Sequence, residues 1–192
     1  AYAWNYKNNT TINSGKGSNT WSTSLLNKTN LNKNFITNIG ADWAAKIDMT
    51  TWKVGGNTND NIGEQPAKTA YQNEIVSPVT TNTTDKSTTY SAKVGLMYAS
   101  DYGFAAAPSA WTTNLDSYGS STSVNWMYMG LYECTISRHS DDANYVFGVY
   151  FVGGVGYYIA YFTFAVRPVF YLTSSVNYAS GSGSATDPIL IN

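Results

Sequence analysis

The chain has 192 residues and a net charge of −1, and only 12% of its residues are charged, about half the usual share in soluble proteins. This length predicts one domain with a sizeable core, and the charge balance offers no basic patch for nucleic acid. No run of about 18 apolar residues occurs, so no membrane span is expected. The lone cysteine, Cys134, excludes an internal disulfide, and the absence of a cysteine–histidine cluster argues against structural zinc.

The first half of the chain predicts helices separated by polar loops. Apolar residues recur at roughly helical spacing between 21 and 40, which predicts a helix that ends at Gly40. A second helix is expected over 41–47, with Trp43 packed into the core. Strands or extended segments are expected at 1–6, 51–54, 68–76 and 92–99.

The second half is richer in strands. A loop is expected over 101–121, with Trp111 buried in it. Extended segments are expected over 125–138, 166–172 and 189–191, with a turn-rich stretch over 181–188. The sequence thus predicts a single α+β domain over 1–192, in which two early helices pack on short, mostly antiparallel strands with long loops. Its helical and loop-rich half spans 1–90, and its strand-rich half spans 91–192.

The segment 139–166 has the most unusual composition in the chain. Nine of its 28 residues are Tyr or Phe, and none is Lys, Glu, Gln, Met or Trp. These five types number 24 in the whole chain. All their codons end in a purine, whereas an asparagine codon randomised at its two adenines keeps a pyrimidine there. Every residue of the segment falls within the set that such randomised codons encode, which indicates adenine-directed diversification by a retroelement.

A constant framework is also visible within this segment. The small residues Val146, Val149, Val155 and Val166 are spaced like inward positions of strands, and Gly153 marks a turn. Aromatic residues of scattered position lie between them and do not alternate cleanly, so some are expected to face outward. Tyrosine suits a diversified binding surface because its rigid ring gives contact area at low entropic cost. The alternative is an ordinary aromatic-rich β core.

Several short stretches frame this segment, namely Lys93–Tyr98, Asn125-Trp126, Glu133–Arg138, Arg167–Phe170 and Gly181–Gly183, with a tail through Asp187-Pro188-Ile189. Together they resemble the formylglycine-generating-enzyme-like branch of the C-type lectin fold, the scaffold of many retroelement-diversified variable proteins, and the tail resembles surface proteins of Firmicutes and their phages. The resemblance covers roughly 90–192. Where the family usually has Glu-Trp, this chain has Glu133-Cys134, so a buried, inert thiol is expected, with an introduced or reactive site as the alternative.

The resemblance implies an extracellular domain, displayed on a cell or phage surface, that binds a protein or glycan ligand and serves in adhesion or receptor binding. His139, Asp141 and Asp142 are further candidates for contact with the ligand, and Arg167 is expected to be structural, pairing with Glu133 or with a backbone carbonyl. The varied positions implied to line one exposed face and bind the ligand are Asn144, Tyr145, Phe147, Tyr150, Phe151, Val152, Gly154, Tyr157, Tyr158, Ile159, Tyr161, Phe162 and Phe164.

Three other functions are open at this point. An enzyme of the same fold would hold copper between cysteines, and this chain has one cysteine; its only histidine, His139, lies in the variable segment, so no catalytic residue, metal or cofactor is expected. A calcium-dependent lectin would carry Glu-Pro-Asn or Trp-Asn-Asp, which are absent, although Asp141-Asp142 could join a calcium site. A pilus-tip or phage tail-fibre module with a role in assembly is the third alternative.

Overall fold

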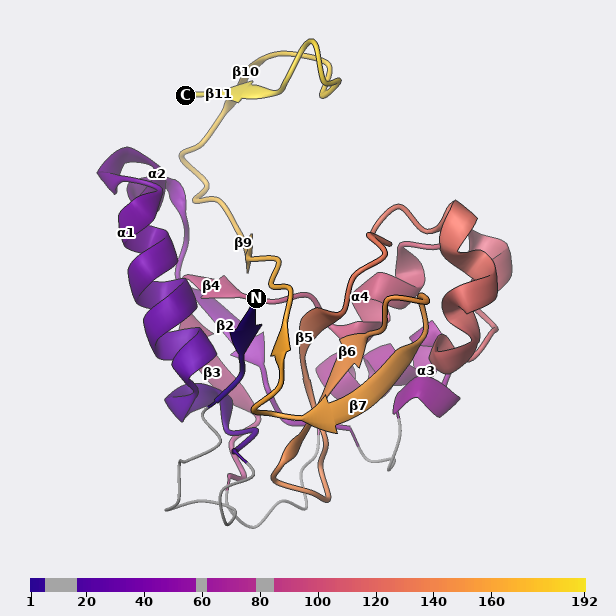
Figure 1. The fold of residues 1–192 in the computed structure, drawn as a ribbon. Coiled ribbons are helices and arrows are strands. Elements are labelled where there is room, and N and C mark those ends of the chain that lie inside the picture. The colour runs from indigo at the N-terminus through magenta and orange to yellow at the C-terminus, as the bar shows by residue number, and fades with distance from the viewer. Residues whose placement is uncertain (6–16, 58–61, 79–84) are drawn as a thin grey trace.

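The computed structural model describes residues 1–5, 17–57, 62–78 and 85–192 (Figure 1). Within these ranges, helices and small antiparallel sheets occur together, which confirms the α+β class. Among the described residues, no helix has the length and apolar character needed to cross a membrane. The helical elements are η1 (Trp21–Thr23), η2 (Leu26–Phe35), α1 (Ile36–Asn38), α2 (Ala41–Lys46), η3 (Ile62–Glu64), α3 (Ala67–Tyr71), η4 (Gln72–Val76), α4 (Ala99–Phe104), η5 (Pro108–Ala110) and η6 (Leu115–Val124).

The strands are short and pair mainly with partners that are distant in sequence. The pairs β1–β8, β2–β3, β4–β9 and β10–β11 are two-stranded, whereas β5, β6 and β7 form a three-stranded sheet in that order, and all these pairs are antiparallel. The strands are β1 (Tyr2–Ala3), β2 (Thr50–Lys53), β3 (Thr89–Ala92), β4 (Val94–Gly95), β5 (Glu133–Arg138), β6 (Tyr145–Val149), β7 (Val155–Ile159), β8 (Thr163–Phe164), β9 (Val169–Phe170), β10 (Tyr178–Ser180) and β11 (Leu190–Ile191).

The β5–β6–β7 sheet lies between two hydrophobic clusters. One face packs against α3, α4 and η6 through a cluster that includes Phe147 and Val149. The opposite face packs against η1, η2 and β2 through a cluster that includes Cys134, Val146 and Tyr158. Because successive side chains of a strand point to opposite faces, a sheet covered on both sides buries consecutive residues. This double coverage explains why the segment shows no apolar–polar alternation.

The C-terminal hairpin stands apart from this sheet. Figure 1 shows the chain running away from β9 and ending in β10 and β11, beyond the end of α2. The bridge between Ile47 and Leu172 and the bond from the Thr173 N–H to the Lys46 carbonyl, 2.8 Å long, tie the start of this run to the body. The strands beyond it pair with each other.

Several expectations from the sequence are wrong. Residues 68–76 are helical, in α3 and η4, since Ala67, Ala70 and Glu74 are buried at helical spacing. The strand expected over 92–99 is interrupted, and α4 begins at its end. The side chains of Trp43 and Trp111 are 47% and 38% exposed, because their short helical turns lie at the surface rather than under a second layer.

Candidate functional site

The segment 139–166 follows β5 and forms the β6–β7 hairpin and β8. The Tyr150 N–H donates to the Gly154 carbonyl and the Ala160 N–H donates to the Asn144 carbonyl, each over 2.8 Å. In an antiparallel pair, every second residue bonds across to its partner strand. The residues between the bonded pairs, at odd-numbered positions of β7, therefore point both their N–H and their C=O groups away from β6, toward the outer edge of the sheet.

Two glycines make room for aromatic rings on this hairpin. A Cβ on Gly156 would lie 2.6 Å from the ring of Tyr150, and a Cβ on Gly148 would lie 2.5 Å from the ring of Tyr158 and 2.6 Å from the Glu133 carbonyl oxygen. Both rings thus rest directly on the backbone of the sheet, a close approach that only glycine permits. The sequence in this region fixes the ring positions as much through its glycines as through its tyrosines.

Eight side chains line an open groove of about 430 Å³ beside the hairpin. Seven of them belong to the thirteen positions implied by the resemblance, and none of the eight carries a charge. We call this hollow the aromatic groove. Its lining residues are Tyr132, Tyr145, Tyr150, Tyr157, Tyr158, Ile159, Phe162 and Phe164.

Tyr132 is the groove residue that the sequence did not indicate. It precedes β5, outside the segment 139–166, and its ring centre lies 5.5 Å from that of Tyr150, 5.3 Å from Phe151 and 5.0 Å from Phe164. The contact arises because the start of β5 lies beside the β6–β7 turn. No sequence signal within 139–166 could reveal it, although an aromatic residue flanking a strand next to the segment is the kind of position to inspect.

The other predicted contact positions are distributed differently. Phe147 and Gly154 are buried, so neither presents a side chain to a ligand, contrary to the expectation of one exposed face. Tyr158 also departs from it, because its side chain borders the groove but is only 5% exposed. The exposed pair at the hairpin turn is Phe151 and Val152. The half-buried residues outside the groove are Asn144, whose amide donates to Asp142, and Tyr161, whose ring packs edge-on against Phe162.

Two of the groove tyrosines use their hydroxyl groups in hydrogen bonds within the protein. The Tyr158 hydroxyl donates to the Cys134 Sγ over 3.1 Å, and the Tyr150 hydroxyl donates to the Tyr157 carbonyl over 2.8 Å. Burial raises the pKa of the Cys134 thiol to about 12 and the pKa of Tyr158 well above its ordinary value. The Cys134 side chain is fully buried, so it belongs to the base of the site and not to its surface.

His139 holds the loop that leads into β6. Its ring stacks on Phe147, with centres 5.7 Å apart, and its Nδ1 accepts from the N–H groups of Asp141 and Asp142 over 3.2 and 3.1 Å. The side chain of His139 is only 8% exposed. These contacts give it a structural role beneath the loop, whereas Asp141 is exposed beside it.

The predicted role of Arg167 is confirmed. Its Nε lies 2.8 Å from Glu133 Oε1, and its Nη2 donates to the Met127 carbonyl over 2.8 Å. Burial raises the pKa of Glu133, and the neighbouring guanidinium opposes that shift. This ion pair connects the chain between β8 and β9 to the start of β5, next to Tyr132, and so braces one wall of the aromatic groove.

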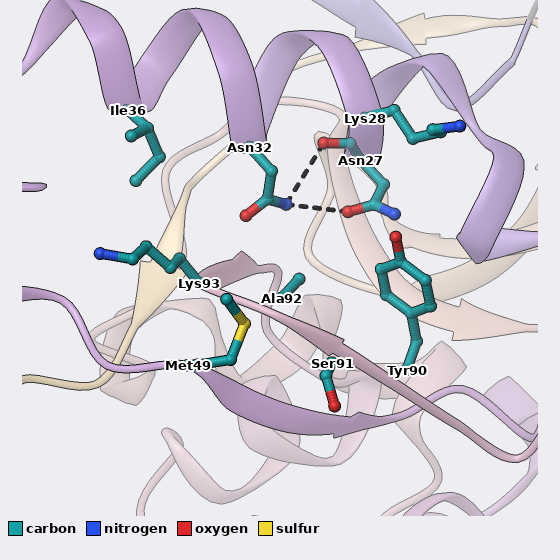
Figure 2. A pocket seen from close by; sticks show the side chains of 9 residues that line it. All are labelled: Asn27, Lys28, Asn32, Ile36, Met49, Tyr90, Ser91, Ala92 and Lys93. Atoms are coloured by element: carbon teal, nitrogen blue, oxygen red, sulfur yellow. Dashed lines mark hydrogen bonds between the residues drawn. The ribbon is translucent and has the colours of Figure 1, made fainter.

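A second hollow, of about 300 Å³, lies between η2 and the β2–β3 pair (Figure 2). Figure 2 shows Asn27 and Asn32 on the helix above Ala92 and Lys93. The Asn32 amide donates to Asn27 and to the Val94 carbonyl, and its oxygen accepts the Val94 N–H over 2.9 Å. These amides bond helix to strand, so their role is to hold the fold together.

Over the described ranges, no three His, Cys, Asp or Glu side chains are grouped so that they could hold a metal ion. Comparison with known proteins gives no match: no family model, no curated protein and no solved structure matches this chain. The candidate site is therefore identified from the residues of this chain alone, and the lining of the aromatic groove is the most distinctive set among them.

Proposed function

We propose that this chain is a ligand-binding domain with a C-type lectin-like fold, displayed on a cell or phage surface, and that the aromatic groove is its binding site. In this proposal, a retroelement diversifies the segment 139–166, the ligand is a protein, and the chain catalyses no reaction. The observation that carries the proposal is the clustering of seven variable-segment residues on one groove.

The division of the segment between core and surface supports this role. Val146, Val149 and Val155 are at most 2% exposed, whereas Tyr157 and Phe162 are both 46% exposed at the groove. A binding surface that varies on a constant scaffold requires this division, since the scaffold must stay packed while the contact residues change. Exposed aromatic side chains gathered in one place are typical of surfaces that bind partners.

Sequencing of the gene and its flanks tests the diversification directly. We expect a near-copy of the sequence that encodes 139–166, differing from it only at adenines, beside a reverse-transcriptase gene. A locus without such a copy would contradict retroelement diversification, and it would leave the binding role of the groove to be judged by the next experiment.

Selection from a displayed library of random peptides tests the binding role. Peptides selected on the wild-type chain should lose binding to the double variant Tyr157→Ser/Phe162→Ser, because both side chains line the groove. The matched control is Tyr171→Ser/Tyr178→Ser, which removes two exposed aromatic residues elsewhere. Equal binding by both variants would overturn the proposal. Binding to a glycan array, but to no peptide, that is lost in the Tyr157→Ser/Phe162→Ser variant would instead favour the lectin alternative.

A further inference from the structure

The outer edge of β7 presents donors without acceptors to the aromatic groove. The N–H and C=O groups of Tyr157 and Ile159 point away from β6, as the bonding pattern of the hairpin requires. The Tyr157 carbonyl accepts from the Tyr150 hydroxyl over 2.8 Å, and the Ile159 carbonyl accepts from the Phe162 N–H over 3.0 Å. In the part of the chain that the structure describes, neither of the two N–H groups has an acceptor.

This arrangement opposes the addition of a partner strand. Strand addition needs donors and acceptors in alternation along the edge, and here both outward carbonyls at the exposed end of β7 are already occupied. The Tyr150 side chain lies across Gly156 and its hydroxyl bonds to the Tyr157 carbonyl, so a partner strand could pair with that carbonyl only by displacing the hydroxyl. The free N–H groups of the edge therefore suit a ligand that supplies hydrogen-bond acceptors and has few donors of its own that need a partner.

Side chains of the groove complete this pattern. The hydroxyls of Tyr132, Tyr145 and Tyr157 have no hydrogen-bond partner among the described residues, so each can donate to a ligand. The eight lining side chains include no carboxylate, amide or cation. Rings of Tyr145 and Tyr157 stand edge to face, 5.2 Å apart at an interplanar angle of 89°. Together they form an uncharged aromatic wall with hydrogen-bond donors along it.

We propose that the groove, in its role as the binding site proposed above, takes an extended, uncharged, proline-containing peptide segment of the partner protein. A polyproline II segment exposes its carbonyls, lacks N–H groups at proline and has no internal hydrogen bonds. Its rings pack against aromatic walls, and its low conformational freedom limits the entropic cost of binding.

The test uses three probes added to the ¹⁵N-labelled chain: decaproline, a Gly-Ser decamer and maltohexaose. We expect decaproline to shift the amide resonances of Tyr157 and Ile159 in a saturable way, and the other two probes to leave them unchanged at the same concentration. Tyr157→Phe and Tyr145→Phe keep the rings and remove one hydroxyl, so each should weaken decaproline binding by about threefold to tenfold. Tyr171→Phe, an exposed tyrosine outside the groove, should leave it unchanged.

Two outcomes would overturn the inference. In one, decaproline produces no saturable shift at millimolar concentration, or the Gly-Ser decamer shifts the same amides equally. In the other, maltohexaose alone shifts them. Either outcome leaves the groove as a binding site if peptides selected from the random library still depend on Tyr157 and Phe162, so the failure of the peptide class and the failure of the proposed function are separable.

Discussion

Cys134 illustrates how one residue depends on its surroundings for its chemistry. Its thiol is fully buried in the hydrophobic cluster that covers one face of the β5–β6–β7 sheet, and its Sγ accepts the hydroxyl hydrogen of Tyr158. Only a thiolate reacts quickly with alkylating agents, and burial raises the pKa of this thiol to about 12. Its position beside the tyrosine ring makes it part of the packing that supports the aromatic groove.

We therefore expect Cys134 in the native chain to react with iodoacetamide at pH 8 at least about 100-fold more slowly than in the urea-unfolded chain. Mass spectrometry of timed aliquots measures both rates. A native rate within tenfold of the unfolded rate would show that the thiol reaches solvent and would contradict the packing described.

Glu74 is a second residue whose ionisation depends on burial. Its carboxylate accepts from the Ser137 hydroxyl and from the N–H groups of Ala99 and Ser100, over 3.3 and 3.1 Å, at the start of α4. Burial raises its pKa from 4.5 to about 7, the hydrogen bonds from Ser100 and Ser137 oppose that shift, and the charge of Asp101 adds to it. The folded chain thus holds a proton on Glu74 in a range where the unfolded chain has released it.

This difference predicts a pH-dependent stability. Between pH 4.5 and 7 the folded state binds more protons at Glu74 than the unfolded state, so the free energy of unfolding falls as pH rises through that window, by roughly 3 kcal/mol at most. Glu74→Gln keeps the shape and should remove most of this dependence. Urea unfolding of both chains from pH 4.5 to 8 measures it. Asp101 and Glu133, whose pKa values are also raised, remain in the variant and can leave a residual slope of stability against pH. An unchanged slope in the variant would show that these groups, and not Glu74, cause the dependence.

In the β6–β7 hairpin, two glycines determine where the tyrosine rings of the groove lie. Gly148 and Gly156 lie on the same face, and each supports a tyrosine ring that borders the groove. Above Gly156 the obstacle is the side chain of Tyr150, which can move. Above Gly148 it is both the Tyr158 ring and the Glu133 carbonyl, which belongs to the neighbouring strand.

Substitution by alanine should therefore be tolerated differently at the two positions. Gly156→Ala should lower the free energy of unfolding by about 1–3 kcal/mol, and Gly148→Ala should lower it more, because backbone must also shift. Urea denaturation measures both. Adding Tyr150→Ala to Gly156→Ala should relieve part of its cost, a coupling that a double-mutant cycle detects. Strict additivity would show that the ring does not lie on the glycine.

For the molecule as a whole, the β5–β6–β7 sheet joins the two hydrophobic clusters, and the C-terminal hairpin lies outside both. Tyr178 and Leu190 of that hairpin are 66% and 55% exposed. An isolated two-stranded hairpin is only marginally stable in water. The hairpin therefore contributes little to the stability of the remainder.

Deletion of 174–192 should leave the body folded. We expect the melting temperature to change by no more than about 3 °C, since a loss of about 1 kcal/mol corresponds to that order of shift for a chain of this size. Circular dichroism in the far and near ultraviolet checks both helix content and aromatic packing. Loss of the near-ultraviolet signal would show that the hairpin holds the core together.

Local chemistry in the sequence was enough to indicate several features. Gly40 ends one helix and residues 41–46 form the next, and the strand near 51–54 is present, because helix spacing and turn residues act over a few positions. The segment 139–166 stood out by its composition alone, and the pairing of Arg167 with Glu133 was one of two partners that the family resemblance implied. The helical turn over 68–76 was missed because only three small or polar residues carry its spacing.

The tertiary structure alone decided which aromatic residues meet solvent. Phe147 and Tyr158 are core because layers from 17–35 and 62–118 cover opposite faces of their sheet, and these layers are distant in sequence from the hairpin. Tyr132 joins the groove because β5 pairs with β6, a contact that no periodicity of the segment encodes. Sequence pattern reports the direction of a side chain along its own strand, but burial also depends on what packs above that strand. Composition thus located the surface, and packing selected its residues.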